Sequence, residues 1–507
     1  MSKRVFKLIN NGNQVVLFPT NLSDRIPQDH PVRLVDRIID SLDISAIIEG
    51  YKGGGTSSYS PRMMLKVIIY GYINNIKSCR KIEKALHENI HFMWISGNST
   101  PDFRTINNFR TNRLKDTINT IFTDVVKMLN ELGCLSLDVQ YVDGTKIESV
   151  ANKYTFVWRK SVEKNKSRLE NQIKAVLEEI ESHIKEDNSE GNIEVIPQDL
   201  NADLLSERLN ELNAKIKEKS VKKKVEVLQS ELPRLKKYEQ QLEKMGNRNS
   251  LSKTDEDATF MRMKDDHMKN GQLKPGYNAQ ISTSEQFITN FTITQTPGDT
   301  TTLINHLENF EQAYNVQSSI VVADAGYGSE ENYTYMESKD IDAFVKYNYF
   351  HKEQKRNFHK EIANVENLFY NEKEDFFVCS MGQRMENTGT GKKKTDNGYI
   401  TVLYYYKAKN CKNCPLRGIC HNAKEERVIT FNKRLKQLKK KAKELLLSEE
   451  GIRHRKKRAI EPESVFGQIK SNNSFNRFTL KSLKKVHLEF GLIALAHNFR
   501  KLTKITA

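Results

Sequence analysis

The sequence predicts an α/β protein: a mixed β-sheet with crossover helices, preceded by a helical N-terminal domain and interrupted by two insertions. The first observation is a helical pattern over residues 27–133. The second is a long charged stretch with heptad-spaced aliphatic residues at 160–245, which predicts a helical insertion. The third is a set of apolar, strand-like segments on either side of that stretch, at 134–150, 274–284, 286–298 and 342–348.

Composition limits the class of protein. The chain has 507 residues, long enough for two or more domains, and its 81 Lys and Arg outnumber its 64 Asp and Glu for a net charge of +17. This excess favours a polyanionic partner. No apolar run is long enough to cross a bilayer, the first residues lack a secretory signal core, and six cysteines do not suggest a disulfide scaffold. We therefore expect a cytoplasmic protein.

The N-terminal helical region carries a candidate DNA-reading helix. Two short helices precede a third that is rich in Arg and Asn, including Arg104, Arg110 and Arg113. This order is compatible with a helix-turn-helix, in which the three arginines would contact DNA. An ordinary helical domain with a solvated basic face fits the same pattern equally well.

The charged insertion at 160–245 predicts two antiparallel helices. A polar turn at 186–203 separates its two sets of aliphatic residues, and Pro233 should kink or interrupt the second arm. Such a hairpin is a candidate for contact between protomers or for clamping DNA.

Two aspartates stand at the ends of apolar strands. Asp143, in "YVDGTK", interrupts apolar positions, where a buried carboxylate is costly unless it is exposed, paired or bound to a metal. The alternative is a solvated aspartate in an Asp-Gly turn. Asp324, in "VVADAGYGS", ends a second strand just before a Gly-rich turn, and ligands collect at such strand ends. A site for two divalent cations would need a third acid.

The third acid is Glu463, in "RAIEPESVFGQIK". Pro462 suits the first turn of a helix, on which Glu463, Phe466 and Lys470 share one face. Phe466 would then dock the helix on the sheet and direct Glu463 toward the strand ends. Glu461 is the competing choice, but it precedes the proline and has no lysine at this spacing.

Together, "VDGTK", "ADAGYGSEEN" and "ESVFGQIKSNNSFNRF" resemble the DDE transposases of bacterial insertion sequences. "LSDRIPQDHPVRLVDRIID" and "PDFRTINNFR" resemble the helical N-terminal domain of that family. The resemblance implies a ribonuclease-H-like catalytic domain. It also implies that Asp143, Asp324 and Glu463 hold two Mg²⁺ or Mn²⁺ ions and that Lys470 contacts DNA.

One feature departs from the family pattern. Related families place an arginine four residues before the glutamate and a tyrosine three residues before that arginine. Here those positions hold Ala459 and Lys456. Arg458 lies one residue away from the expected arginine and is left without a role.

The resemblance implies metal-dependent cleavage and strand transfer of the ends of an insertion sequence. The expected partners are double-stranded DNA, as terminal inverted repeats and target, and further copies of the chain, with a dimer as the expected oligomer. We expect a bacterial, nucleoid-associated protein. The alternatives are a metal-dependent nuclease of the same fold that only hydrolyses, and a domesticated DNA-binding protein. Retention of all three acids argues against the latter.

A cysteine cluster predicts a structural zinc site. Cys411, Cys414 and Cys420 have zinc-ligand spacing, and Cys379 on a preceding strand could complete a four-sulfur set. His421 is an alternative fourth ligand, and unligated thiols are the other reading. Between these cysteines and Glu463 lie two basic runs, at 432–447 and 453–458, which we expect to follow DNA phosphates.

The predicted organisation follows the chain. Residues 1–133 form the helical DNA-binding domain, 134–150 begin the catalytic core and 151–250 form the helical insertion; residues 251–348 continue the core, 349–450 hold the Cys-rich insertion and basic helix, and 451–507 supply the C-terminal helices of the core.

Overall fold

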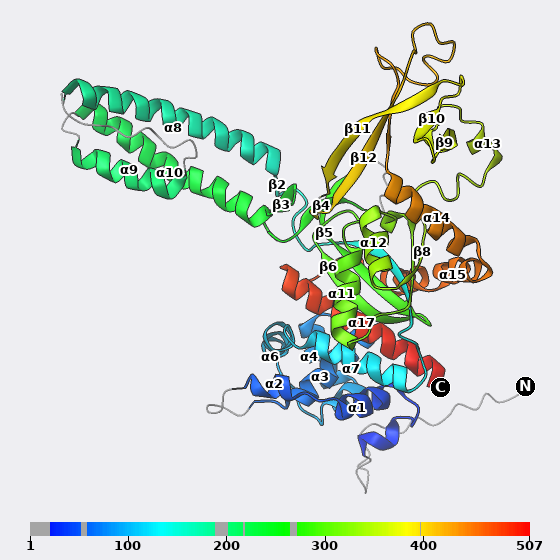
Figure 1. Cartoon of the computed structure of the whole chain (residues 1–507). Helices are drawn as coiled ribbons and strands as arrows, with labels where there is room; N and C mark the ends of the chain where they lie inside the picture. Colours follow the sequence, from blue (N-terminus) through cyan, green and yellow to red (C-terminus); the bar gives the residue numbers. More distant parts are fainter. Residues whose placement is uncertain are drawn as a thin grey trace, which may run out of the picture. The chain divides into compact units, whose positions relative to one another are not determined.

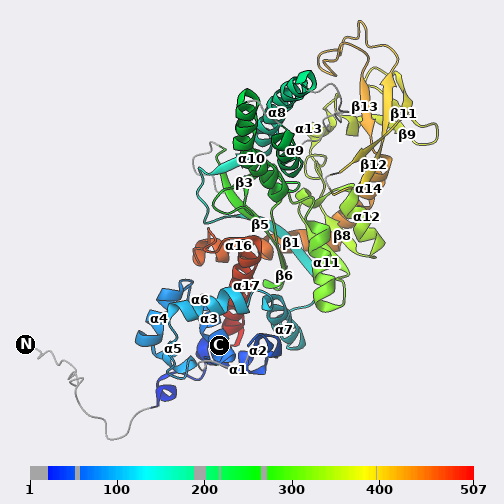
Figure 2. The same cartoon turned by 90° about the vertical axis from the view of Figure 1, so that its left-hand side faces the viewer.

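A computed structural model describes residues 21–51, 58–187, 201–215, 219–263, 271–395 and 397–506. The chain forms two compact units (Figures 1 and 2). The helical unit comprises Met1–Ser136 and Leu488–Ala507, and the sheet unit comprises Leu137–His487. The sequence prediction groups residues 488–507 with the core, whereas the structure groups them with the helical unit. There, Arg500 donates hydrogen bonds to the carbonyls of Tyr72 and Ile73.

The helical unit confirms the helical pattern predicted for the N-terminal region. Its elements are η1 (Leu22–Arg25), α1 (Pro31–Ser41), α2 (Ser45–Glu49), α3 (Pro61–Ile73), α4 (Cys79–Glu88), α5 (Ile90–Ile95), α6 (Phe103–Asn108), the π-helical turn η2 (Phe109–Arg113), α7 (Ile118–Glu131) and most of α17 (Leu483–Thr506). Pro61 opens α3, where its fixed φ suits the first turn. Leu65, Val67 and Ile69 of α3 are fully buried, so this helix is central to the unit.

The main sheet of the sheet unit is mixed, as predicted. Its strands are β1 (Val139–Glu148), β4 (Thr259–Arg262), β5 (Leu273–Ser284), β6 (Phe287–Thr294), β7 (Ile320–Ala323) and β8 (Asp342–Val345). They run in the order β4-β5-β1-β7-β8, and β6 also pairs with β5. β1 is antiparallel to β5 but parallel to β7, which is parallel to β8. This mixed sheet and the helices around it are consistent with a ribonuclease-H-like transposase fold.

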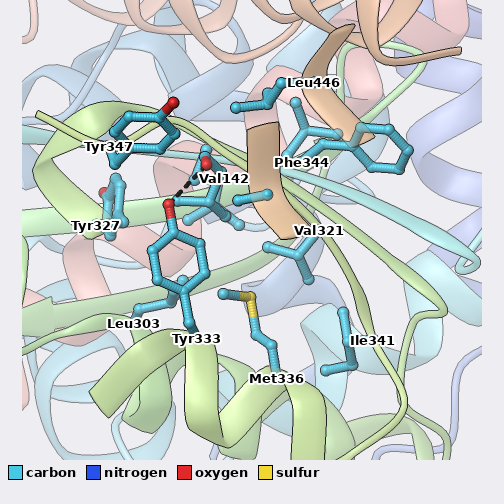
Figure 3. Packing of buried hydrophobic residues seen from close by; sticks show 14 of the residues in the cluster. Val142, Leu303, Val321, Tyr327, Tyr333, Met336, Ile341, Phe344, Tyr347 and Leu446 are labelled. Carbon is cyan, nitrogen blue, oxygen red and sulfur yellow. Dashed lines mark hydrogen bonds between the residues drawn. The ribbon is translucent and has the colours of Figure 1, made fainter. Parts of the chain in front are cut away.

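Helices pack on this sheet and bury its apolar side chains. α11 (Leu303–Tyr314), α12 (Glu330–Ser338) and α14 (Lys433–Leu447) contribute to the cluster drawn in Figure 3, in which Val142, Val321 and Met336 are almost completely buried. α15 (Glu449–Ile460) contacts β7 and β8, and α16 (Pro462–Gly467) contacts β1 and β5. The sheet therefore holds both α15 and α16 at its central strands.

The charged insertion forms three helices where the sequence predicts two. α8 (Arg159–Asp187), α9 (Ala202–Lys215) and α10 (Lys219–Met245) lie side by side (Figures 1 and 2) and share one apolar cluster. Most of the predicted turn, residues 188–200, lies outside the described residues. α10 continues through Pro233, because Leu228 and Leu235 on either side of it are buried in the cluster. β2 (Phe156–Trp158) and β3 (Ser250–Ser252) pair at the base of the insertion.

A second sheet accounts for the Cys-rich insertion. It contains β9 (Phe369–Asn371), β10 (Phe376–Val378), β11 (Arg384–Lys394), β12 (Ile400–Ala408) and β13 (Val428–Phe431), preceded by the short helices α13 (Arg356–His359) and η4 (Val365–Asn367). All its strand pairs are antiparallel. Its longest hairpin, β11–β12, meets the start of α12, where Tyr399 donates to Glu330 at 3.2 Å. In the described part of the chain, no helix is both long enough and apolar enough to cross a membrane.

Candidate active site

The parallel pairing of β1 and β7 brings the two predicted aspartates together. Tyr141 is the register partner of Val322, so the same register carried two residues further sets Asp143 beside Asp324. Asp324 follows the carboxyl end of β7, where open α/β sheets bind ligands, whereas Asp143 lies inside the longer strand β1 and not at its predicted end. β1 runs straight through Asp143 and Gly144, so the Asp-Gly turn considered above does not form. The Asp143 side chain is 14% exposed and that of Asp324 is 51% exposed.

The residue paired with Gly144 on the neighbouring strand β5 leaves no room for a side chain at position 144. A Cβ at this position would clash with the side chain of Gln280, its partner on β5. The Gln280 amide donates to Asp299 at 3.0 Å and accepts a hydrogen bond from the Tyr327 hydroxyl. This buried network lies beside Gly144, the neighbour of Asp143, and sequence reasoning missed Gln280 and its contact with Asp299.

The loop after β7 is held close to β8. Asp324 accepts a hydrogen bond from the backbone N–H of Ala325 at 2.7 Å, which fixes the start of the 3₁₀ turn η3 (Ala325–Tyr327). A Cβ at Gly328 would clash with the carbonyl of Lys346, so only glycine permits this approach. Gly328, the second glycine of "DAGYG", therefore allows the loop that carries Asp324 to lie against the end of β8.

Glu463 comes to the same place from α16. Phe466 is 7% exposed and Val465 is fully buried, which docks the helix and leaves the Glu463 side chain 51% exposed. Glu461, the competing choice, is 1% exposed and accepts a hydrogen bond from the Gln286 backbone at 2.7 Å. Burial raises the pKa of Glu461. Glu461 is thus committed to packing, and Glu463 is the acid that faces the aspartates.

One arginine contacts all three acids. Arg458, on α15, places Nη2 3.6 Å from Asp143 Oδ1 and 3.4 Å from Asp324 Oδ2, and Nη1 3.0 Å from Glu463 Oε1. Its side chain is only 7% exposed, and among the described residues its Nε has no hydrogen-bond partner. Three acids from distant parts of the chain therefore meet around one buried guanidinium. We call Asp143, Asp324, Glu463 and Arg458 the acid cluster.

The charges of the acid cluster contribute to the pKa shifts of neighbouring residues. The pKa of Tyr327 is raised well above its usual value, first by burial and then by the nearby charges of Asp299 and Asp143. The pKa of Lys346 is lowered by burial, an effect that Asp324 partly opposes. Lys346 is thus a further basic residue beside the acid cluster, and sequence reasoning missed it.

Lys470, the predicted DNA-contacting lysine, lies beside the same strand as Asp143. It belongs to the π-helical turn η5 (Gln468–Asn472) that continues α16, and its Nζ donates to the carbonyl of Lys146 on β1 at 3.4 Å. The shared helical face predicted for Glu463 and Lys470 therefore runs along β1.

The acid cluster offers hard oxygen donors, which suit Mg²⁺ or Mn²⁺. No group of three or more His, Cys, Asp or Glu side chains in the described part of the chain stands in a metal-holding arrangement. At the acid cluster, the Arg458 guanidinium occupies the space that the three carboxylates share. A bound cation would therefore have to displace this arginine from at least some of its contacts.

The predicted zinc ligands surround one small cavity in the second sheet. Cys379, Cys411, Cys414 and Cys420 line a space of about 20 Å³ together with His421, and all four thiols are free. Arg427 donates from Nη1 to Cys420 Sγ at 2.8 Å and from its backbone N–H to Cys411 Sγ at 3.4 Å. Both ring nitrogens of His421 are buried, with no hydrogen-bond partner in the described structure. We call these four cysteines, His421 and Arg427 the cysteine cluster.

The structure corrects the role predicted for Arg110. Its side chain is 5% exposed and donates to the Lys77 carbonyl at 2.9 Å and to the Tyr72 hydroxyl at 3.2 Å. Its guanidinium is committed to the interior and is not presented to a phosphate. Arg113 donates to the carbonyl of Gly50, whereas Arg104 is exposed. Of the three arginines, Arg104 keeps the most open position.

Two family models match the chain. Residues 20–112 match the transposase domain DUF772, and residues 378–503 match the transposase DDE domain. The second match includes Glu463 and Lys470, whereas Asp143 and Asp324 precede it. No curated protein matches the sequence.

The fold and the two matches support a DNA transposase, an enzyme that acts on DNA. They are consistent with the DDE-type transposases of insertion sequences, the family that the sequence resembles.

Proposed function

We propose that the protein cuts the ends of its own insertion sequence and joins the resulting 3′ ends to target DNA by a two-metal DDE mechanism. The observation that carries this proposal is the acid cluster, in which three acids from β1, the end of β7 and α16 share one buried cation. In open α/β sheets ligands bind at the carboxyl ends of strands, and Asp324 follows such an end.

Each residue has a distinct proposed role. Asp143, Asp324 and Glu463 would hold the cations, and Lys470 would bind a DNA phosphate near the scissile bond. Two divalent cations, when bound, activate the attacking oxygen and stabilise the leaving oxygen of a phosphodiester. The partly buried Asp143 and the more open Asp324 and Glu463 leave the site accessible from solvent, as a DNA substrate requires.

The proposal is tested with labelled DNA carrying the ends of the element in which the gene lies. The protein is incubated with this DNA, a target plasmid and Mg²⁺, and the products are sequenced. Cuts at the element ends followed by joined products support the proposal. Cuts without joined products indicate a nuclease that only hydrolyses, and DNA binding without cuts indicates a DNA-binding protein. Either outcome overturns strand transfer.

A further inference from the structure

A large cavity in the sheet unit lies outside the acid cluster. It encloses about 710 Å³. Its walls are one face of α14, the segment that follows β8, the helix α13, and aromatic residues of β9 and β13. We call it the lysine pocket, after the five lysines of α14 that line it: Lys433, Lys436, Lys439, Lys440 and Lys443.

Two of these lysines carry charge that no carboxylate of a described residue neutralises. Lys433, Lys439 and Lys443 pair with Asp375, Glu366 and Glu353 at 2.7, 3.3 and 2.9 Å. Lys436 and Lys440 are exposed, and no carboxylate of a described residue lies within ion-pairing distance of either. Of the three glutamates on the wall, two are already paired and Glu372 is the third. The pocket therefore favours an anion between Lys436 and Lys440.

Aromatic rings stand beside these free cations. Lys436 Nζ lies 5.0 Å from the ring centre of Tyr370 and 5.2 Å from that of Phe431. Tyr349, also on the wall of the pocket, is 49% exposed, and Lys352 Nζ lies 5.3 Å from the centre of its ring. An exposed aromatic ring next to lysines is the combination that single-stranded nucleic acid uses, with bases stacked on rings and phosphates on cations.

The backbone of Tyr349 gives an independent sign of function. Its φ is +76°, a left-handed conformation that is costly for a bulky residue. Residues held in such conformations cluster at ligand clamps and active sites. Here the strained backbone keeps an aromatic ring at the wall of the pocket, close to Phe358, with ring centres 5.9 Å apart.

The lysine pocket is joined to the acid cluster by a short segment. The charges of Asp324 and Glu463 act to raise the pKa of Lys346, which places this lysine near the acid cluster. Lys346 is followed directly by Tyr347, Asn348 and Tyr349 on the wall of the pocket. Three residues span at most about 11 Å of extended chain. A DNA strand that lies across the acid cluster can therefore reach the pocket within a few nucleotides.

We propose that the lysine pocket binds a single-stranded nucleotide segment of the DNA strand that leaves the acid cluster, with a phosphate between Lys436 and Lys440 and a base stacked on Tyr349. This inference rests on the proposed function for the source of the strand. Binding itself needs none of the three acids.

Binding of a fluorescent oligo-dT to the full chain, followed by anisotropy in EDTA, tests the pocket without cleavage. Lys436→Glu/Lys440→Glu should weaken binding by about tenfold or more, and Tyr349→Ala by about fivefold or more, the range expected for loss of one stacked base. Tyr349→Phe keeps the ring and should bind like the wild type. A duplex of the same length should lose less affinity than the single strand in each variant.

The matched control is Lys222→Glu/Lys223→Glu on α10, two exposed lysines that give the same change of net charge. Equal losses in the two double variants would overturn the pocket, because general charge would then explain both. Tight binding of dTMP alone, lost in the same variants, would show a free-nucleotide site and would also contradict the proposal. Thermal melting confirms that each variant folds.

Asp324→Asn separates this inference from the proposed function. It should bind oligo-dT like the wild type. If element-end DNA is not cut but the pocket variants still lose oligo-dT binding, the function fails and the pocket stands.

Discussion

The acid cluster and the cysteine cluster belong to the same unit, and each contains a buried arginine. Arg458 contacts three carboxylates, and Arg427 contacts two of the four thiols. The sequence predicts a metal at both. They differ in where their residues come from and in how open they are.

The acids come from segments about 300 residues apart in the chain, and two of the three side chains are half exposed. The cysteines come mostly from one short loop and line a cavity of only about 20 Å³. An open site can exchange a cation and admit substrate, whereas a closed one suits a structural ion. Because of this difference, we expect the acid cluster to control chemistry and the cysteine cluster to control folding.

The largest expected effect is on cleavage. Asp143→Asn, Asp324→Asn and Glu463→Gln should each lower the rate of end cleavage by about 10²–10³-fold or more, because charge stabilisation at the reacting phosphate is lost. Cleavage of labelled end DNA in Mg²⁺ measures this.

The matched control is Glu450→Gln, a solvent-facing carboxylate on the same helix as Arg458. It should cleave like the wild type. DNA binding should be similar in all four variants. Full activity of Asp324→Asn would contradict a catalytic role for the acid cluster.

The next effect concerns metal removal at the cysteine cluster. Cys411→Ser with Cys414→Ser should abolish one zinc per chain, measured by elemental analysis after purification without chelator. It should also destabilise the second sheet by an amount on the order of several kcal/mol, because binding energy at a structural zinc site is folding energy.

Cys134→Ser, a partly exposed thiol of the helical unit, is the reference and should change neither zinc content nor stability. A wild-type protein that carries no zinc would leave four unligated thiols and remove the structural role.

A smaller effect distinguishes the two arginines. If Arg458 stands where a cation would bind, Arg458→Gln should lower stability by about 1–2 kcal/mol without metal, because three carboxylates are left together. Mn²⁺ should recover most of that loss, so the thermal shift on adding Mn²⁺ should be larger than in the wild type. Arg427→Gln should show no such recovery by Mn²⁺. Recovery in both variants would contradict a cation site that is specific to Arg458.

The smallest effect uses a third buried arginine, Arg110, as a reference that lies outside both clusters. Arg110→Gln should cost about 1 kcal/mol in the presence or absence of Mn²⁺, because it leaves the Lys77 carbonyl and the Tyr72 hydroxyl without their donor.

Arg104→Gln should leave stability unchanged. If Arg104 contacts a phosphate, this variant should reduce the salt dependence of DNA binding by about one unit of slope. Salt titrations of binding and thermal melts of both variants measure these effects. A stable Arg110→Gln that binds DNA more weakly would restore the DNA contact predicted from sequence.

Much of the acid cluster could be predicted from sequence because its rules are local. Asp143 interrupts an apolar strand and Asp324 follows one, and the parallel register of β1 and β7 brings the two together. Glu463 follows from Pro462 and the apolar face of its helix. Arg458 could not be predicted, because a shift of one residue turns a side chain about 100° around a helix, and only the packing of α15 shows which side faces the acids.

Elsewhere, burial by residues distant in sequence limited what could be predicted. Nothing in the spacing of Arg104, Arg110 and Arg113 shows that Tyr72 and Lys77 enclose the second of them. Likewise, Pro233 predicts a kink or an interruption in the second arm, but no interruption forms, because the buried leucines on both sides keep α10 continuous. In each case contacts distant in sequence outweigh the local pattern.

The most direct test of the central claim replaces Mg²⁺ with Fe²⁺ and adds ascorbate and peroxide, so that radicals cut the backbone next to the bound ion. The account predicts cuts near Asp143, Asp324 and Glu463 together, suppressed by excess Mg²⁺ and lost in Asp324→Asn. Cuts near only one of these residues, or cuts unchanged in Asp324→Asn, would contradict it.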